Sequence, residues 1–115
     1  MKELIYLAGP YSNGSPEANT RKAIEWADTL LAGRYYPFVP HLTHFWHLWS
    51  PKGYEDWMDY DFHFLEVCQA LVRIPGLSGG ADREVKRAVV KGIPVIFRST
   101  AAQAVAELDK WFKKK

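Results

Sequence analysis

Residues 61–84, DFHFLEVCQALVRIPGLSGGADRE, decide the fold of this 115-residue chain. Within them, residues 70–74 (ALVRI) form a short apolar run that is typical of a buried strand. Residues 75–81 (PGLSGGA) are rich in glycine and predict a turn. A helix is expected over residues 82–91, because the glycine and proline of residues 92–94 then stop it. The stretch therefore predicts a strand, a glycine-rich turn and a helix in direct succession.

This turn lies where open α/β sheets bind ligands, beyond the carboxyl end of a strand and at the amino end of a helix. Free N–H groups and the helix dipole favour an anion there. Glu84 is expected in the first turn of the helix, where the dipole favours its ionised form. An ionised carboxylate beside a binding crevice is a candidate nucleophile.

A second carboxylate, Asp61, falls on the apolar face of a helix predicted over residues 54–68, together with Met58, Phe62 and Leu65. Burying a carboxylate is costly unless it has a partner or a task. One interpretation is a structural Asp61 paired with an arginine or a backbone N–H. The other is that Asp61 faces Glu84 across the crevice, so that the two carboxylates divide nucleophilic and acid–base duties.

The remaining chain alternates between strands and helices. Apolar runs predict strands over residues 4–8, 36–40 and 94–98, and helical spacing predicts helices over residues 17–32 and 101–112. Two prolines favour an edge position for the strand at 36–40. The order implies a parallel sheet of four to five strands covered on both faces. We therefore expect one α/β domain over residues 1–115, a flavodoxin/Rossmann-like three-layer sandwich.

Two details of this outline are specific enough to check. The helix over residues 17–32 should end at Gly33 and turn inward the side chains of Ala23, Ala27, Leu30 and Leu31. Residues 41–53, rich in histidine and tryptophan, are expected to form a long irregular segment.

Composition narrows the possible functions. The net charge is +2, and only Lys113-Lys114-Lys115 forms a basic run, which a frayed, solvated tail explains. We therefore expect no nucleic-acid polymer as a partner. No apolar run has membrane-spanning length and residues 1–10 do not resemble a signal peptide, so no membrane association is expected. The single cysteine, Cys68, excludes an internal disulfide, suits a structural role on a buried face and favours a cytoplasmic location.

Two loops carry further candidate binding residues. Gly9-Pro10-Tyr11 follows the first strand, where Gly9 allows close approach to the backbone and Tyr11 offers a hydroxyl to a carboxylate or a sugar. An ordinary surface turn gives the same pattern. Ser78, Gly79 and Gly80 suit an anion cradle, but they lack the spacing of a Walker loop or a dinucleotide fingerprint.

The histidines at positions 41, 44 and 47 are spaced by three residues, which invites a metal hypothesis. Pro40 precedes them, aromatic residues surround them and no His-Glu-x-x-His motif occurs, so we expect neither a metal nor a cofactor. We favour an apolar slot for a planar group, lined by His41, His44 and Trp46. The tryptophans at 46, 49 and 57 equally suit a core or an oligomer interface.

Taken together, these motifs resemble the nucleoside 2-deoxyribosyltransferase superfamily. The resemblance spans most of the chain, in order, through residues 6–11 (YLAGPY), Asp61, residues 70–74, Ser78-x-Gly80-x-x-x-Glu84, Ala88 and residues 92–96 (GIPVI). The superfamily includes base transferases, N-glycosidases of deoxynucleoside 5′-monophosphates, and small phage and bacterial proteins that this chain matches best in length.

The resemblance implies cleavage of the N-glycosidic bond of a (deoxy)nucleoside or its 5′-monophosphate, by hydrolysis or by base transfer. Glu84 would be the nucleophile that forms a glycosyl-enzyme ester. Asp61 would orient Glu84 or handle the proton at the base, and Tyr11 would hold the nucleophile or the sugar.

The same resemblance implies a site for the 5′ end of the ligand. Ser78 and Gly80 would bind it, and a serine at this position is typical of the monophosphate glycosidases, whereas many transferases have an acid. Gly9 and Pro10 would line the site, and Arg21 is a possible second phosphate contact. The ligand is thus expected to be a small nucleoside or nucleotide.

The chain departs from the family pattern in three places. Cys68-Gln69 replaces an acid that usually precedes the central strand, and Arg73 lies inside that strand. Residues 41–53 have no clear counterpart and are expected to close over the base. Small members usually complete their sites across a subunit interface, so a homo-oligomer is expected.

Two other functions remain open from the sequence. A non-catalytic module of the same fold would bind or sense a nucleotide without turning it over. An NAD-cleaving enzyme would break the same type of bond, but it needs room for a dinucleotide and no second nucleotide motif is present.

Overall fold

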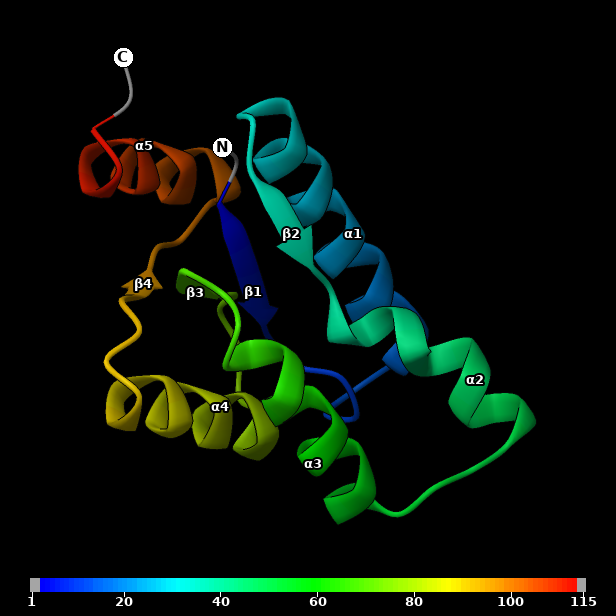
Figure 1. Cartoon of the computed structure of the whole chain (residues 1–115). Coiled ribbons are helices and arrows are strands. Elements are labelled where there is room, and N and C mark those ends of the chain that lie inside the picture. The colour runs from blue at the N-terminus through cyan, green and yellow to red at the C-terminus, as the bar shows by residue number, and fades with distance from the viewer. Residues whose placement is uncertain (1–2, 114–115) are drawn as a thin grey trace.

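Four parallel strands form the sheet, in the order β2-β1-β3-β4. The computed structural model describes residues 3–113, so Lys114 and Lys115 of the basic run lie outside the described residues. The elements are β1 (Leu4–Ala8), α1 (Pro16–Ala32), β2 (Tyr36–Phe38), a 3₁₀ turn (Pro40–Thr43), α2 (His44–Trp49), α3 (Tyr54–Leu65), β3 (Ala70–Arg73), α4 (Gly79–Val90), β4 (Val95–Phe97) and α5 (Ala101–Trp111). The predicted α/β class and the alternation of strands and helices are confirmed (Figure 1).

The sheet is covered on both faces, as predicted for a three-layer sandwich. One face packs Ile5, Leu7 and Val72 against α1 and α5. The other packs Tyr6 and Leu71 against α3 and α4. Side chains alternate between the faces of a strand, so the register that pairs Tyr6 with Leu71 fixes which strand residues meet α4.

The edge position of β2 and the cap of α1 at Gly33 are confirmed, but the inward face of α1 differs from the prediction. Trp26 is buried together with Ala23 and Leu30, whereas Leu31 is 52% exposed. Leu31 follows Leu30 by one residue, which is about 100° around a helix. It therefore points away from the face that Ala23, Trp26 and Leu30 share.

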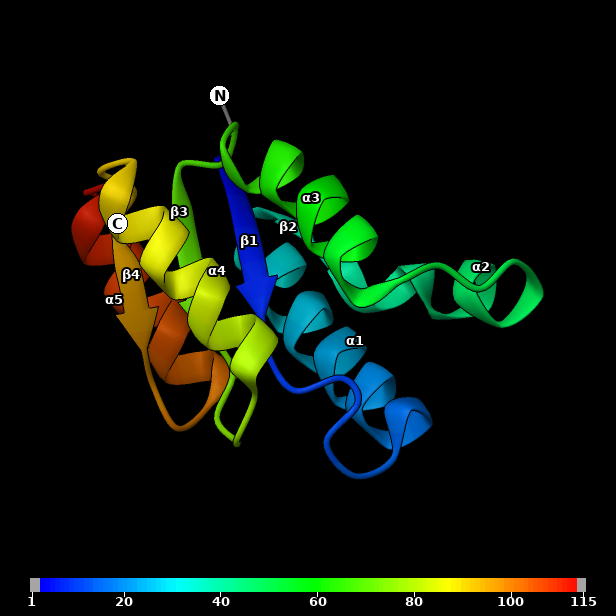
Figure 2. The same cartoon turned by 90° about the horizontal axis from the view of Figure 1, so that it is seen from below.

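The prediction of a long irregular segment over residues 41–53 is wrong. Its first part is helical, with a 3₁₀ turn that leads directly into α2, and only residues 50–53 are irregular. No glycine or proline interrupts residues 41–50, so nothing breaks the helix locally. Both views show α2 and the loop after it projecting away from the sheet (Figures 1 and 2).

Among residues 3–113, no helix is long and apolar enough to cross a membrane. Cys68 is a buried free thiol that donates to the carbonyl of Phe64 at 3.3 Å. Burial raises the pKa of this thiol to about 11, which agrees with the structural role expected for it.

Candidate active site

A cleft of about 510 Å³ opens at the carboxyl edge of the sheet. Its walls come from the loop after β1, the segment from the 3₁₀ turn through α2 to α3, and the amino end of α4. Asp61 and Glu84 both line it. The volume lies within the range of about 300–1,000 Å³ that is typical of small-molecule sites. The structure thus brings the two predicted carboxylates to one cavity.

Glu84 lies deeper in its helix than the sequence predicts. Ser78 caps α4, and its Oγ accepts from the N–H of Ala81 at 3.0 Å, so the helix begins at Gly79 and Glu84 falls in its second turn. Glu84 is only 6% exposed, and burial raises its pKa to about 8. The predicted first-turn position is therefore wrong, and burial favours the protonated form of Glu84 rather than the ionised form expected from the helix dipole.

Tyr6 is the residue that contacts Glu84. Its buried hydroxyl donates to Glu84 Oε2, and this hydrogen bond, like the charge of Arg73, acts against the rise in the pKa of Glu84. Burial and the neighbouring carboxylates raise the pKa of Tyr6 itself well above its usual value, so Tyr6 remains a donor. Tyr6 was not among the predicted catalytic residues.

Asp61 is the second buried carboxyl group of the cleft, at 8% exposure. Burial raises its pKa to about 7. Its Oδ1 is buried and finds no hydrogen-bond partner among the described residues. The expected structural pairing of Asp61 is therefore not seen for this oxygen, which leaves a polar group on the wall of a cleft without a protein partner.

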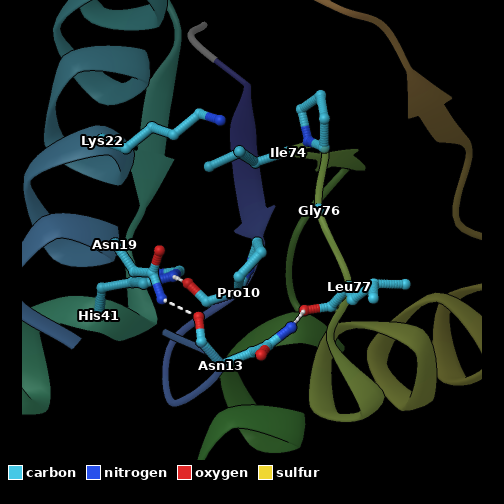
Figure 3. Close-up of a pocket in the computed structure, with 10 residues that line it drawn as sticks. Pro10, Asn13, Asn19, Lys22, His41, Ile74, Gly76 and Leu77 are labelled. Atoms are coloured by element: carbon cyan, nitrogen blue, oxygen red, sulfur yellow. Dashed lines mark hydrogen bonds between the residues drawn. The ribbon is translucent and has the colours of Figure 1, made fainter. Parts of the chain in front are cut away.

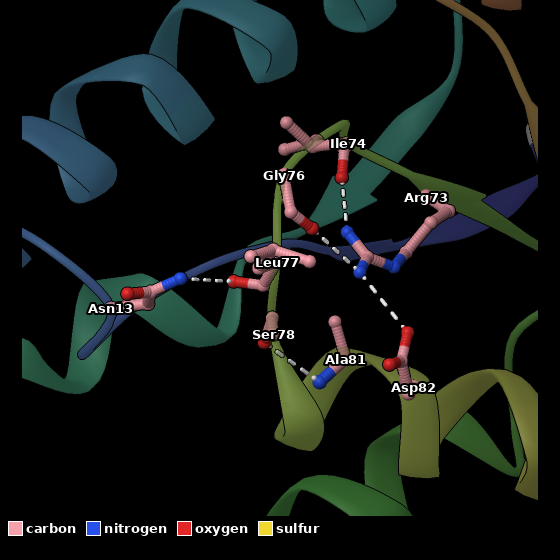
Figure 4. Close-up of polar contacts among 8 residues, drawn as sticks. All are labelled: Asn13, Arg73, Ile74, Gly76, Leu77, Ser78, Ala81 and Asp82. Atoms are coloured by element: carbon pink, nitrogen blue, oxygen red, sulfur yellow. Dashed lines mark hydrogen bonds and ion pairs between the residues drawn. The ribbon is translucent and has the colours of Figure 1, made fainter.

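Arg73 connects the glycine-rich turn to α4 (Figure 4). Its guanidinium donates to the carbonyl of Ile74, to the carbonyl of Gly76 at 2.9 Å and to Asp82 at 3.1 Å. The arginine lies in the central strand β3 and is only 7% exposed. Its departure from the apolar family pattern thus has a structural reason, because it fixes the turn that carries Ser78.

The loop after β1 is fastened to this turn. The Asn13 amide donates to the carbonyl of Leu77 at 3.0 Å, and Asn19 donates to the carbonyl of Asn13 (Figure 3). Asn19 also donates to the carbonyl of Tyr11 at 2.8 Å. A Cβ at Gly9 would lie 2.9 Å from the Ile74 side chain. Gly9 is therefore required for packing between the strands, whether or not a ligand approaches it.

The predicted residues of the first loop and of the histidine-rich segment contact each other. The Tyr11 hydroxyl bonds His44 Nδ1 at 2.5 Å, and His41 Nε2 donates to the carbonyl of Pro10 at 2.9 Å. Tyr11 and His41 line the cleft, whereas His44 does not and packs edge-on against the Tyr11 ring. Burial lowers the pKa of His41, which favours its neutral form.

Among the other predicted binding residues, some line the cleft and others do not. Ser78 and Gly80 line the cleft at the amino end of α4. Arg21 is exposed and does not line the cleft, whereas its neighbour Lys22 extends from α1 into a smaller cavity of about 220 Å³ (Figure 3). Trp46 is 45% exposed and packs edge-on against Trp57.

The segment leading into α3 contributes cleft residues that the prediction did not name as binding residues: His47, Lys52, Tyr54 and Trp57. They share no motif, and only their density of aromatic and polar groups marks them in the sequence. No cluster of three His, Cys, Asp or Glu side chains within residues 3–113 is arranged to hold a metal ion.

Comparison with known proteins places this geometry in context. A family model described as a domain of unknown function (DUF7768) matches residues 3–98, and no curated protein matches the chain. The structure is similar to a 2-deoxyribosyltransferase from Bacillus psychrosaccharolyticus, with a TM-score of 0.63 and 21% identity over 84% of this chain and 72% of that one. It is also similar to one from Leishmania mexicana, with a TM-score of 0.62 and 18% identity over 85% of this chain and 65% of that one. The predicted nucleoside 2-deoxyribosyltransferase-like fold is thus confirmed.

Proposed function

The chain belongs to the DUF7768 family, and from the chemistry of its cleft we propose that it breaks the N-glycosidic bond of a (deoxy)nucleoside or its 5′-monophosphate. One observation carries this proposal. Two buried carboxyl groups meet at the cleft, and one receives a tyrosine hydrogen bond while the other keeps an oxygen without a protein partner. Such a pair costs stability unless a ligand uses it.

The pair is poised to divide the two tasks of glycosidic cleavage. With pKa values of about 7 for Asp61 and about 8 for Glu84, the pair holds a single proton over a range near neutral pH. The Tyr6 hydroxyl and the Arg73 charge favour the negative charge on Glu84. Because the higher pKa belongs to Glu84, the shared proton lies mainly on Glu84 in the free protein, and the proposed reaction requires a ligand that moves it to Asp61.

In the proposed reaction, a Glu84 oxygen bonds to the anomeric carbon as the bond from that carbon to the base breaks. The base leaves with the bonding electron pair and takes the proton of Asp61. A water molecule or a second base then attacks the anomeric carbon of the ester and gives its proton to Asp61. This step releases the sugar product and restores the Glu84 carboxylate.

The 5′ end of the ligand is proposed to lie at the amino end of α4. Ser78 and Gly80 line the cleft there, and the first N–H groups of a 12-residue helix favour a negative charge. The Ser78 oxygen already accepts from Ala81, so its hydroxyl proton remains available for a phosphate oxygen.

The test is an incubation of wild-type protein, Glu84→Gln and Glu25→Gln with deoxynucleosides and their 5′-monophosphates, with and without an acceptor base. Free base is followed by chromatography, and protein quenched during turnover is weighed by mass spectrometry. We expect release by wild type and by the control Glu25→Gln, whose exposed side chain lines neither the cleft nor the smaller cavity beside Lys22. Glu84→Gln should release base at least about 10³-fold more slowly, and it should lack the added mass of the sugar, or of the sugar phosphate where a monophosphate is the substrate.

A nucleotide-sensing module is the second candidate, and one observation favours it. A pKa of about 8 keeps much of Glu84 protonated at neutral pH, which weakens it as a nucleophile. The sensor predicts saturable nucleotide binding with no release of base from any substrate. That outcome in the same panel would contradict the catalytic proposal.

The homo-oligomer expected from the family resemblance is also a proposal. Large apolar side chains are exposed on and beside α2: Leu42, Phe45, Leu48 and Trp49 at 60%, 79%, 59% and 89%. Light scattering should show a dimer or larger assembly that Phe45→Ser weakens and the exposed control Val90→Ser does not. A monomeric wild type would contradict this proposal.

A further inference from the structure

One wall of the cleft is made by His47, Lys52 and Trp57. These residues come from α2, from the loop after it and from α3. They belong neither to the carboxyl pair nor to the glycine-rich turn. The proposed reaction gives them no part, although they line the same cavity.

The ring of His47 is held in one tautomer. The indole N–H of Trp57 donates to His47 Nδ1 at 2.8 Å, and the backbone N–H of Lys52 donates to the same nitrogen at 3.3 Å. Both groups can only donate, so Nδ1 must be the acceptor. In the neutral ring the proton therefore lies on Nε2, which makes Nε2 a hydrogen-bond donor.

Lys52 supplies a second donor beside the same indole. Its ammonium lies 5.3 Å from the Trp46 ring centre and 5.8 Å from that of Trp57, and it donates to the Ser50 carbonyl at 3.3 Å and to the Ser50 hydroxyl at 3.1 Å. No carboxylate pairs with it in the part of the chain that the structure describes. An ammonium has three N–H groups, so one remains for a ligand.

We infer that this wall recognises the leaving base and selects bases that carry a carbonyl oxygen over their amino counterparts. The inference rests on the proposed function for the position of the sugar over Glu84. In a furanose, the base and the 5′ carbon are attached on either side of the ring oxygen. With the 5′ end at Ser78 and Gly80, the base extends away from α4, toward the wall of His47, Lys52 and Trp57.

The chemistry of the wall fits a base better than a phosphate. An indole face suits a planar ring, and two donors beside it match a carbonyl oxygen and disfavour an amino group. When the glycosidic bond breaks, the base keeps the bonding electron pair, and part of that charge moves onto its carbonyl oxygen. The hydrogen bond from Lys52 then strengthens in the transition state, which assists departure of the base.

The test uses the Glu84→Gln protein, so that binding is measured without turnover. Calorimetry compares 2′-deoxyinosine and 2′-deoxyadenosine 5′-monophosphates, which carry a carbonyl and an amino group at the same ring position. We expect the first to bind about 10- to 100-fold more tightly, the effect of a hydrogen bond to a charged group. Adding Lys52→Met or His47→Asn should remove most of that preference.

The variants are chosen to spare the fold. Asparagine places its amide oxygen near the position of the histidine Nδ1, so Trp57 keeps an acceptor, and Lys52 is exposed. His63→Asn and Lys86→Met, at exposed sites outside the cleft, are the matched controls and should leave the preference unchanged.

Equal binding of the two nucleotides, or a preference that survives both changes, would overturn the inference. So would a loss of affinity in Lys52→Met for nucleotides but not for the matching nucleosides, because Lys52 would then contact the phosphate. A preference that depends on His47 and Lys52, without base release by the wild type, would support the inference and contradict the proposed catalysis. Base release by the wild type without the preference would support the proposed catalysis and contradict the inference.

Discussion

Replacing Glu84 with glutamine should change how stability depends on pH. In the folded protein burial raises the pKa of Glu84 from its ordinary 4.5 to about 8. The folded state therefore keeps a proton that the unfolded chain releases above about pH 4.5, and the protein loses stability as the pH rises through that interval. Each pKa unit corresponds to about 1.4 kcal/mol, so Glu84 should cost the wild type roughly 4 kcal/mol between about pH 5 and pH 8.5.

Urea unfolding across this pH range measures the effect. Glutamine stays neutral at every pH. The free energy of unfolding of Glu84→Gln should therefore fall by roughly 4 kcal/mol less than that of the wild type over the interval. The free energies of unfolding of the two proteins should be closest at low pH and should diverge as the pH rises. Glu25→Gln, at an exposed site, should follow the wild type at every pH. Parallel curves for wild type and Glu84→Gln would refute the reasoning, because Glu84 would then titrate normally.

Three further changes test the cleft. Tyr6→Phe removes the hydroxyl that favours the Glu84 anion. The rise of base release with pH should therefore move to higher pH, and the rate at about pH 7 should fall about 10- to 100-fold. An unchanged pH profile would contradict this. Asp61→Asn should abolish base release yet stabilise the protein at about pH 8 by roughly 2–4 kcal/mol in urea unfolding, since it removes a buried charge; a destabilised variant would argue for a structural Asp61. Arg73→Met should destabilise the protein by about 2–4 kcal/mol at any pH near neutral, because three acceptors lose a buried donor. The control Arg87→Met, at a half-exposed ion pair, should lower the free energy of unfolding by at most about 1 kcal/mol.

Much of the fold was predictable because its signals are local. The apolar runs of β1 and β3 and the glycine-rich turn between β3 and α4 each specify one structure. The start of α4 was also accessible, since serine is a preferred N-cap residue. Choosing Ser78 as the cap would have put Glu84 in the second turn and removed the expectation of an ionised carboxylate.

Tyr6 shows what a single sequence leaves open. Alternation places Tyr6 and Ala8 on one face of β1, but it does not say which face meets α4. The available signal was a phenol within a fully buried apolar run, because a buried tyrosine hydroxyl usually needs a partner. That partner, Glu84, is 78 residues away in sequence, so only the packing of the sheet against α4 identifies it.

The segment over residues 41–53 was unpredictable for a different reason. Helix α2 has six residues, none of them buried, so no core fixes its position. Isolated helices of this length are marginal in water. Its place depends instead on contacts made at a distance, such as the hydrogen bond from Trp57 to His47. The residues that make these contacts also line the cleft. The least predictable segment is therefore the one to which we assign selection of the base.

The burial of Asp61 argues that the cleft is built for a ligand rather than for stability. A carboxyl group that served the fold alone would be expected to use both oxygens, since a buried polar atom without a partner costs about 1–3 kcal/mol. Asp61 instead leaves Oδ1 without a protein partner, and its charge makes the neighbouring Glu84 costlier to ionise. An apolar residue of similar size would remove both penalties. The arrangement therefore makes physical sense when a ligand supplies the missing partner and uses the proton that burial keeps on the pair.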